Sequence, residues 1–239
     1  GHSEEGDGDN KGLLPRLQAG DREFRRGDRD TKGCGMDREA EVGAEPRAFF
    51  AALPALLGRV DSPRRAAFAA ACAERLAGAV PGGVPQVARA ALDLLWDSLT
   101  DSAGLDAREL ARAADQCEAQ VASEDALIDL RAVASDDALA AVVFALRARL
   151  SGDAQHAIWA ARRVWDSIDW YLANCTVPAA SEEAILTHRL VRSESRRQAR
   201  DIDALTVSRD ISLSAVVREL RETAQLDANE VLGCPAERT

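Results

Sequence analysis

The sequence predicts an all-α protein, a compact multi-helix bundle of about seven to eight helices. The hydrophobic fraction is 46%, but aromatic residues make up only 4%, so alanine and the aliphatic residues supply the core. Between residues 49 and 226 no segment shows the period-two alternation of Val, Ile, Thr and aromatic residues that indicates strands. Helix-capping residues instead alternate with apolar residues spaced three and four apart.

The first four predicted helices are bounded by capping or helix-breaking residues. Asp61, followed by Ser62 and Pro63, combines an N-cap carboxylate with a proline in the first turn. In the third helix the apolar residues recur at helical spacing and include Trp96, which is therefore expected in the core. These signals place the helices at about residues 49–57, 62–79, 85–99 and 106–121.

The later helices follow an ambiguous stretch, residues 122–134, which fits either a helical turn or a covered loop. Ser135, with Asp136 and Asp137, provides the next clear helix start. The predicted later helices span residues 135–151, 153–174, 181–207 and 212–226, and the third of these is the longest.

The chain divides into one predicted domain and two tails. Residues 1–45 are rich in Gly, Asp, Glu and Arg and lack periodic apolar positions, so we expect a flexible charged tail. The only methionine is Met36, which suggests that this tail is in part a tag or upstream sequence. Residues 46–233 form the predicted single domain, and residues 234–239 a C-terminal tail.

Charge and hydropathy argue against two classes of partner. The formal charge of −10 disfavours nucleic acid, and the cluster of Arg196, Arg197 and Arg200 is interpreted as solvated or salt-bridged. No run of about 18 apolar residues predicts a membrane span. The five cysteines are odd in number, widely spaced and form no CxxC pair, which is typical of a reduced, cytoplasmic protein. Cys72 and Cys117 lie among apolar neighbours and are interpreted as small hydrophobic residues.

Signatures of catalysis and cofactor binding are absent from the sequence. There is no glycine-rich phosphate loop, HExxH, GxSxG or dinucleotide fingerprint. His156 and His188 each stand alone, without a neighbour at metal-ligand spacing. We therefore predict no catalytic residue, no cofactor and no metal.

Glu194 is the best candidate for a buried ionisable group. At 100° per residue it falls on the apolar side of its helix, together with Leu190 and Ile202, and Asp201 lies on the same side. A carboxylate there is either paired with an arginine of a neighbouring helix or perturbed for function. Glu194 and Asp201 therefore form the candidate buried polar site.

Other charged residues are expected to pair. Glu74 and Arg75 are well placed for pairing between helices. Arg89, four residues before Asp93, is the natural partner of that carboxylate.

The helix over residues 153–174 offers a candidate protein interface. Its apolar stripe faces the core and consists of Ile158, Ala161, Trp165, Ile168 and Leu172. Trp159 and Trp170 fall on a different side, which they share with Arg163 and Asp166. Either the helix is central and buried on both sides, or these residues anchor a contact with a second copy or another protein.

The predicted helices carry segments that are similar to a known family. The segments are FAAACAERL at residues 68–76, ALDLLWD at residues 91–97, RLSG at residues 149–152, RDI at residues 200–202, and residues 229–233. Together they resemble the YjaG-like family of uncharacterised bacterial proteins. The chain departs from the family at residues 77–79, where it lacks a proline and a tyrosine. The resemblance implies an all-helical fold and assigns no reaction.

Two functions fit these observations. The first is a non-catalytic protein-interaction module, an adaptor, regulator or immunity-type protein that binds another protein or a second copy of itself. The second is a small-molecule enzyme or ligand-binding protein with an inter-helix pocket around Glu194 and Asp201. The absence of catalytic motifs favours the first. A pocket containing Glu194 would favour the second, and a filled core with Glu194 bound to an arginine would rule it out.

Overall fold

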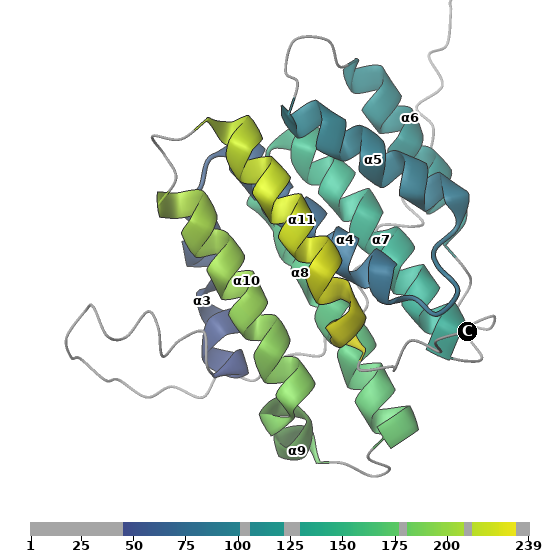
Figure 1. Ribbon diagram of the computed structural model, residues 1–239, viewed down its shortest axis with the longest axis vertical. Coiled ribbons are helices and arrows are strands. Elements are labelled where there is room, and N and C mark those ends of the chain that lie inside the picture. The colour runs from purple at the N-terminus through teal and green to yellow at the C-terminus, as the bar shows by residue number, and fades with distance from the viewer. Residues whose placement is uncertain (1–44, 101–105, 122–129, 177–180, 208–211, 233–239) are drawn as a thin grey trace, which may run out of the picture. The chain divides into compact units, whose positions relative to one another are not determined.

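The computed structural model describes residues 45–100, 106–121, 130–176, 181–207 and 212–232 (Figure 1). Every regular element within these ranges is a helix, and none of the described residues belongs to a strand. The prediction of a compact all-α fold is therefore confirmed. The predicted tails lie outside the described residues, except for Glu45, whose carboxylate caps the first described helix.

The first four described helices have bounds close to those predicted. The Asp61 carboxylate accepts a hydrogen bond from the Arg64 N–H (3.0 Å), and the Asp106 carboxylate accepts one from the Arg108 N–H (2.9 Å). Both caps satisfy backbone donors that have no partner within the helix. The helices are α3 (Pro46–Gly58), α4 (Ser62–Ala79), α5 (Gln86–Thr100) and α6 (Ala107–Glu118).

The predicted helix start at Ser135 is wrong, because α7 (Leu130–Ser151) begins earlier. Asp137 does not cap this helix. It lies within α7 and accepts hydrogen bonds from two side chains of the next helix, α8 (Ala154–Tyr171). At 22 residues α7 is the longest described helix, and residues 138–146 are all buried.

Helix α8 ends close to the predicted position and passes into a π-helical turn, η2 (Leu172–Thr176). The helix predicted over residues 181–207 is instead two helices, α9 (Glu182–Thr187) and α10 (Arg189–Val207). They are separated at His188, whose backbone is extended (ψ 143°). The Nδ1 atom of His188 accepts a hydrogen bond from the Leu190 N–H (3.3 Å), so this histidine acts as an N-cap for α10.

The last described helix, α11 (Leu213–Val231), extends beyond the predicted end at residue 226. It packs against α4, which is also in contact with α7 and α8 (Figure 1). Residues 66–77 of α4 are buried without interruption. The approach to α11 is close, because a Cβ atom added to Gly78 would lie 2.6 Å from the Cβ atom of Ala228. Alanine and glycine thus place α4 at the centre of the helical packing.

Candidate functional site

Arg75 of α4 and two carboxylates of α10 form a buried ion cluster. The Arg75 side chain donates from Nε to Glu194 Oε1 (3.2 Å) and from Nη1 to Asp201 Oδ2 (2.5 Å). Arg75 and Glu194 are 0% exposed and Asp201 is 1% exposed. The helical wheel of α10 therefore placed both carboxylates correctly, and the partner is an arginine of a neighbouring helix.

Polar neighbours extend this cluster. The Gln198 amide donates to Glu194 Oε1 (3.0 Å) and to the carbonyl oxygen of Ala161 in α8 (3.3 Å). Arg197 Nη1 lies 3.8 Å from Glu194 Oε2, and Arg197 Nη2 pairs with Glu230 Oε2 of α11 (2.6 Å). The cluster thus joins α4, α8, α10 and α11, and its charges are compensated within the protein.

Cys72 lies at the edge of the same cluster, where its Sγ accepts a hydrogen bond from Arg75 Nη2 (3.5 Å). Burial raises the pKa of the Cys72 thiol well above its ordinary value, which outweighs the opposing effect of Arg75. The thiol is therefore protonated at neutral pH and is not a nucleophile. This agrees with the interpretation of Cys72 as a small hydrophobic residue.

A second cluster is centred on the buried Glu74 of α4. Its carboxylate accepts two hydrogen bonds from Arg89 (2.8 Å each), one from Trp96 Nε1 (2.8 Å) and one from Gln225 (3.3 Å). Burial alone would raise the pKa of Glu74, but the hydrogen bonds from Arg89 and Trp96 outweigh it and hold the pKa below its ordinary value.

The expected pairs around this second cluster are present. Arg89 reaches Asp93 (3.2 Å), as its spacing predicted, and Glu74 and Arg75 both pair with other helices. The bond from Trp96 to Glu74 could not be read from the sequence, because it joins two helices. Arg221 of α11 adds a cation–π contact, with its Cζ atom 5.9 Å from the centre of the Trp96 ring.

The candidate interface of α8 is half-buried along its length. Trp159, Arg163, Asp166 and Trp170 all have intermediate exposure. Trp159 packs on Phe144 of α7, with ring centroids 5.2 Å apart. The structure brings Arg163 and Asp166 together, at 3.9 Å. Helix α7 therefore covers one edge of this row and leaves part of each side chain accessible.

The apolar stripe of α8 is buried at four of its five predicted positions. Trp165 differs, because it has intermediate exposure and packs against Phe50 of α3, with ring centroids 5.4 Å apart. The buried positions are Ile158, Ala161, Ile168 and Leu172.

A third charged group, missed by the sequence analysis, links α7 to α8. Asp137 accepts hydrogen bonds from Ser167 Oγ (2.6 Å) and from Arg163 (3.3 Å). Burial raises the pKa of Asp137 to about 6 despite these bonds, and burial raises the pKa of Asp166 to about 7. Asp166 keeps a third of its side chain exposed, so solvent screens its interaction with Arg163 more strongly.

Replacing Asp137 with asparagine is expected to change the pH dependence of stability. Between pH 4 and 6 the folded protein retains a proton on Asp137 that the unfolded chain has released. The unfolding free energy of the wild type therefore falls as pH rises through this window, by about 3 kcal/mol for a rise of roughly two pKa units. Asparagine does not titrate, so the unfolding free energy of Asp137→Asn should lack this fall. Between pH 4 and pH 7, urea unfolding should therefore show the variant gaining about 3 kcal/mol of stability relative to wild type. Parallel pH profiles for the two proteins would contradict this assignment.

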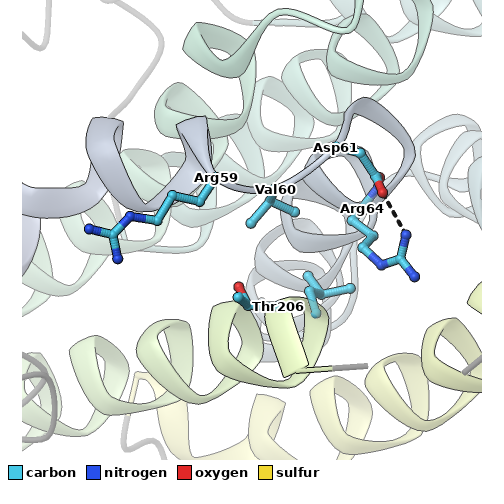
Figure 2. Close-up of a pocket in the computed structure, with 6 residues that line it drawn as sticks. Arg59, Val60, Asp61, Arg64 and Thr206 are labelled. Atoms are coloured by element: carbon cyan, nitrogen blue, oxygen red, sulfur yellow. Dashed lines mark hydrogen bonds and ion pairs between the residues drawn. The ribbon is translucent and has the colours of Figure 1, made fainter. Parts of the chain in front are cut away.

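A pocket of about 300 Å³ lies between the junction of α3 with α4 and the C-terminal end of α10. Figure 2 shows Val60 and Thr206 facing each other, while the guanidinium groups of Arg59 and Arg64 point in opposite directions. Arg64 is paired with Asp61 (2.5 Å). The pocket is lined by Arg59, Val60, Asp61, Arg64, Leu205 and Thr206, and therefore by neither Glu194 nor Asp201.

Among the described residues, no three His, Cys, Asp or Glu side chains are grouped as a metal site requires. None of the described helices has both the length and the apolar character to cross a membrane.

These features define the class of the protein as an all-α domain with buried inter-helix ion clusters. Neither a family model nor a curated protein matches the chain. Its fold is similar to the crystal structure of a DUF416 family protein from Shewanella baltica. The two align with a TM-score of 0.59 and 19% sequence identity, over 68% of this chain and 88% of the other. At this identity the similarity establishes the fold.

Proposed function

We propose that residues 46–233 form a non-catalytic protein-interaction module of the adaptor, regulator or immunity type. We also propose that this domain is distantly related to the DUF416 and YjaG-like proteins. One observation carries the proposal. The carboxylates best placed for catalysis, Glu194 and Asp201, are enclosed from solvent and bound to Arg75. Groups held in this way stabilise helix packing and have no access to a substrate.

The same observation removes the basis of the alternative. A small-molecule enzyme centred on Glu194 and Asp201 requires a cavity that both carboxylates reach. Glu194 Oε1 is bound by Arg75 and Gln198, both carboxylates are buried, and the described pocket lies elsewhere. The geometry therefore favours binding over catalysis.

The surface proposed for binding is the row of Trp159, Arg163, Asp166 and Trp170 on α8. Tryptophan and arginine are enriched among residues that dominate interface energies. The partner is another protein or a second copy of the chain. We place the protein in the cytoplasm, because the described cysteines, Cys72, Cys117 and the exposed Cys175, are free thiols.

The double variant Trp159→Ser/Trp170→Ser is expected to remain folded and to lose self-association or partner binding. Two hot-spot residues contribute about 2 kcal/mol each, so the dissociation constant should rise by about a thousandfold. Sedimentation velocity measures association, and circular dichroism measures folding.

Trp165→Ser is the matched control, because it removes the same side chain from the same helix on the side that faces α3. It should lower stability and leave association intact. Equal loss of association in both proteins, or unfolding of the double variant, would contradict the α8 interface. A wild-type monomer that captures no protein from its native cell would contradict the interaction module itself.

A further inference from the structure

The outward face of α10 carries a row of four exposed arginines, Arg189, Arg192, Arg196 and Arg200, here called the arginine ridge. Their spacing of three and four residues places them within about 80° of arc, opposite the buried Glu194. At 1.5 Å per residue the ridge is about 16 Å long.

Most of the ridge lacks an internal counter-charge. Arg200 pairs with Asp201 (3.0 Å) and with Asp227 of α11 (2.6 Å). In the part of the chain that the structure describes, the side chains of Arg189, Arg192 and Arg196 make no hydrogen bond or ion pair. The adjacent Arg197, which faces inward, is paired with Glu230.

This arrangement disfavours the helix itself. Like charges three and four residues apart repel along a helix face. Arg189 and Arg192 also lie in the first turns of α10, where the helix dipole disfavours cations. The exposed Asp203 follows on the same side of α10, three residues after Arg200. The stretch from Arg189 to Arg196 is therefore the part of this surface that gains stability from an external anion.

We propose that the arginine ridge docks an acidic helical segment of another protein, one with carboxylates repeated every three and four residues along one face. Such a helix has the same rise per residue as α10, so its carboxylates match the ridge in register. Guanidinium groups bind carboxylates through paired, charge-assisted hydrogen bonds. The ridge shares no residue with the α8 interface, and the two proposals stand independently.

Two features favour a carboxylate row over nucleic acid. Helix α10 contains no aromatic residue on which a base could stack. Three or four arginines also release few counterions, so phosphate binding would be weak.

The test measures binding of the full chain to a fluorescein-labelled alanine-based helical peptide of about 20 residues, with glutamates every three and four residues on one face. The same peptide with glutamine in place of glutamate, and a labelled single-stranded oligothymidine, serve as comparison probes. Fluorescence anisotropy is recorded for wild type and for Arg192→Glu/Arg196→Glu. A second variant, Arg192→Gln/Arg196→Gln, removes the charges without reversing them.

Arg108→Glu/Arg112→Glu is the matched control. These arginines of α6 are also exposed and four residues apart. Each of the two double Arg→Glu variants changes the net charge from −10 to −14, because each substitution contributes two units. We expect the glutamate peptide to bind wild type, and the α10 reversal to weaken binding by at least about tenfold. The α6 reversal should change binding by less than about twofold.

Three results would overturn the proposal. The glutamate peptide fails to bind wild type, or binds no better than the glutamine peptide. The α6 and α10 variants lose binding equally. The oligothymidine binds more tightly than the peptide and depends on Arg192 and Arg196, which would assign the ridge to nucleic acid.

Discussion

Replacing Arg75 with methionine is expected to lower the unfolding free energy by about 3 to 5 kcal/mol. This is the cost of removing one partner of a buried ion pair and leaving the opposite charge buried. Methionine fills much of the same volume, so the loss comes from charge. Glu194 and Asp201 would remain buried, at 0% and 1% exposure, without their shared cation. Urea unfolding monitored by circular dichroism at pH 7 measures the change directly.

Two comparisons isolate this electrostatic cost. Adding Glu194→Gln and Asp201→Asn to Arg75→Met should recover most of the stability, because a fully neutral core carries no unpaired charge. Arg64→Met, on the same helix, removes the partner of the half-exposed Asp61 and should cost less than about 1 kcal/mol. A cost for Arg75→Met no larger than that for Arg64→Met would mean that the cluster is not a structural element.

The cluster explains how an alanine-rich bundle fixes the arrangement of its helices. Alanine faces are small and similar, so they pack closely without defining a single register. Ion pairs of Arg75 and Glu74 connect α4 to α10 and α5, and a hydrogen bond from Gln225 to Glu74 connects α4 to α11. A shift of one helix turn would separate these groups and leave charges buried without partners. Specific packing of α4 therefore rests on charge as well as on apolar contact.

The sequence was sufficient for features set within one helix. The period of 3.6 residues placed Trp96 and Glu194 in the core, and both are at most 1% exposed. The spacing of Arg89 and Asp93 also predicted their contact. The identity of the arginine that binds Glu194 could not be predicted, because the partners are 119 residues apart and meet only in the folded protein.

The errors arise where a local signal competes with a tertiary contact. Asp137 resembles a capping residue, but its carboxylate binds α8, so α7 starts earlier than predicted. His188 is an uncommon N-cap, and the helical pattern continues through it, which concealed the break before α10. Adjacency in the sequence groups Arg196 and Arg200 with Arg197, which is buried, and leaves out Arg189 and Arg192, because exposure on one face depends on how α10 packs.

Trp96→Ala is expected to cost about 3 to 5 kcal/mol of unfolding free energy, the range for removing a large aromatic residue from a core. Trp96 is 1% exposed, so alanine leaves a cavity between α4, α5 and α11. The buried Glu74 also loses the indole N–H donor at 2.8 Å, and Arg221 loses the ring beneath its guanidinium group. Both losses add to the cavity cost.

Trp96→Phe separates packing from hydrogen bonding. Phenylalanine keeps most of the apolar volume but cannot donate to Glu74, so its cost should fall to about 1 to 3 kcal/mol. Because Arg89 still binds both carboxylate oxygens of Glu74, that carboxylate remains charged and the variant should unfold in one cooperative step. Urea unfolding of both variants with equal m-values would support this partition. A cost below about 1 kcal/mol for Trp96→Ala would contradict the burial of Trp96, and equal costs for the two variants would assign the whole effect to the bond with Glu74.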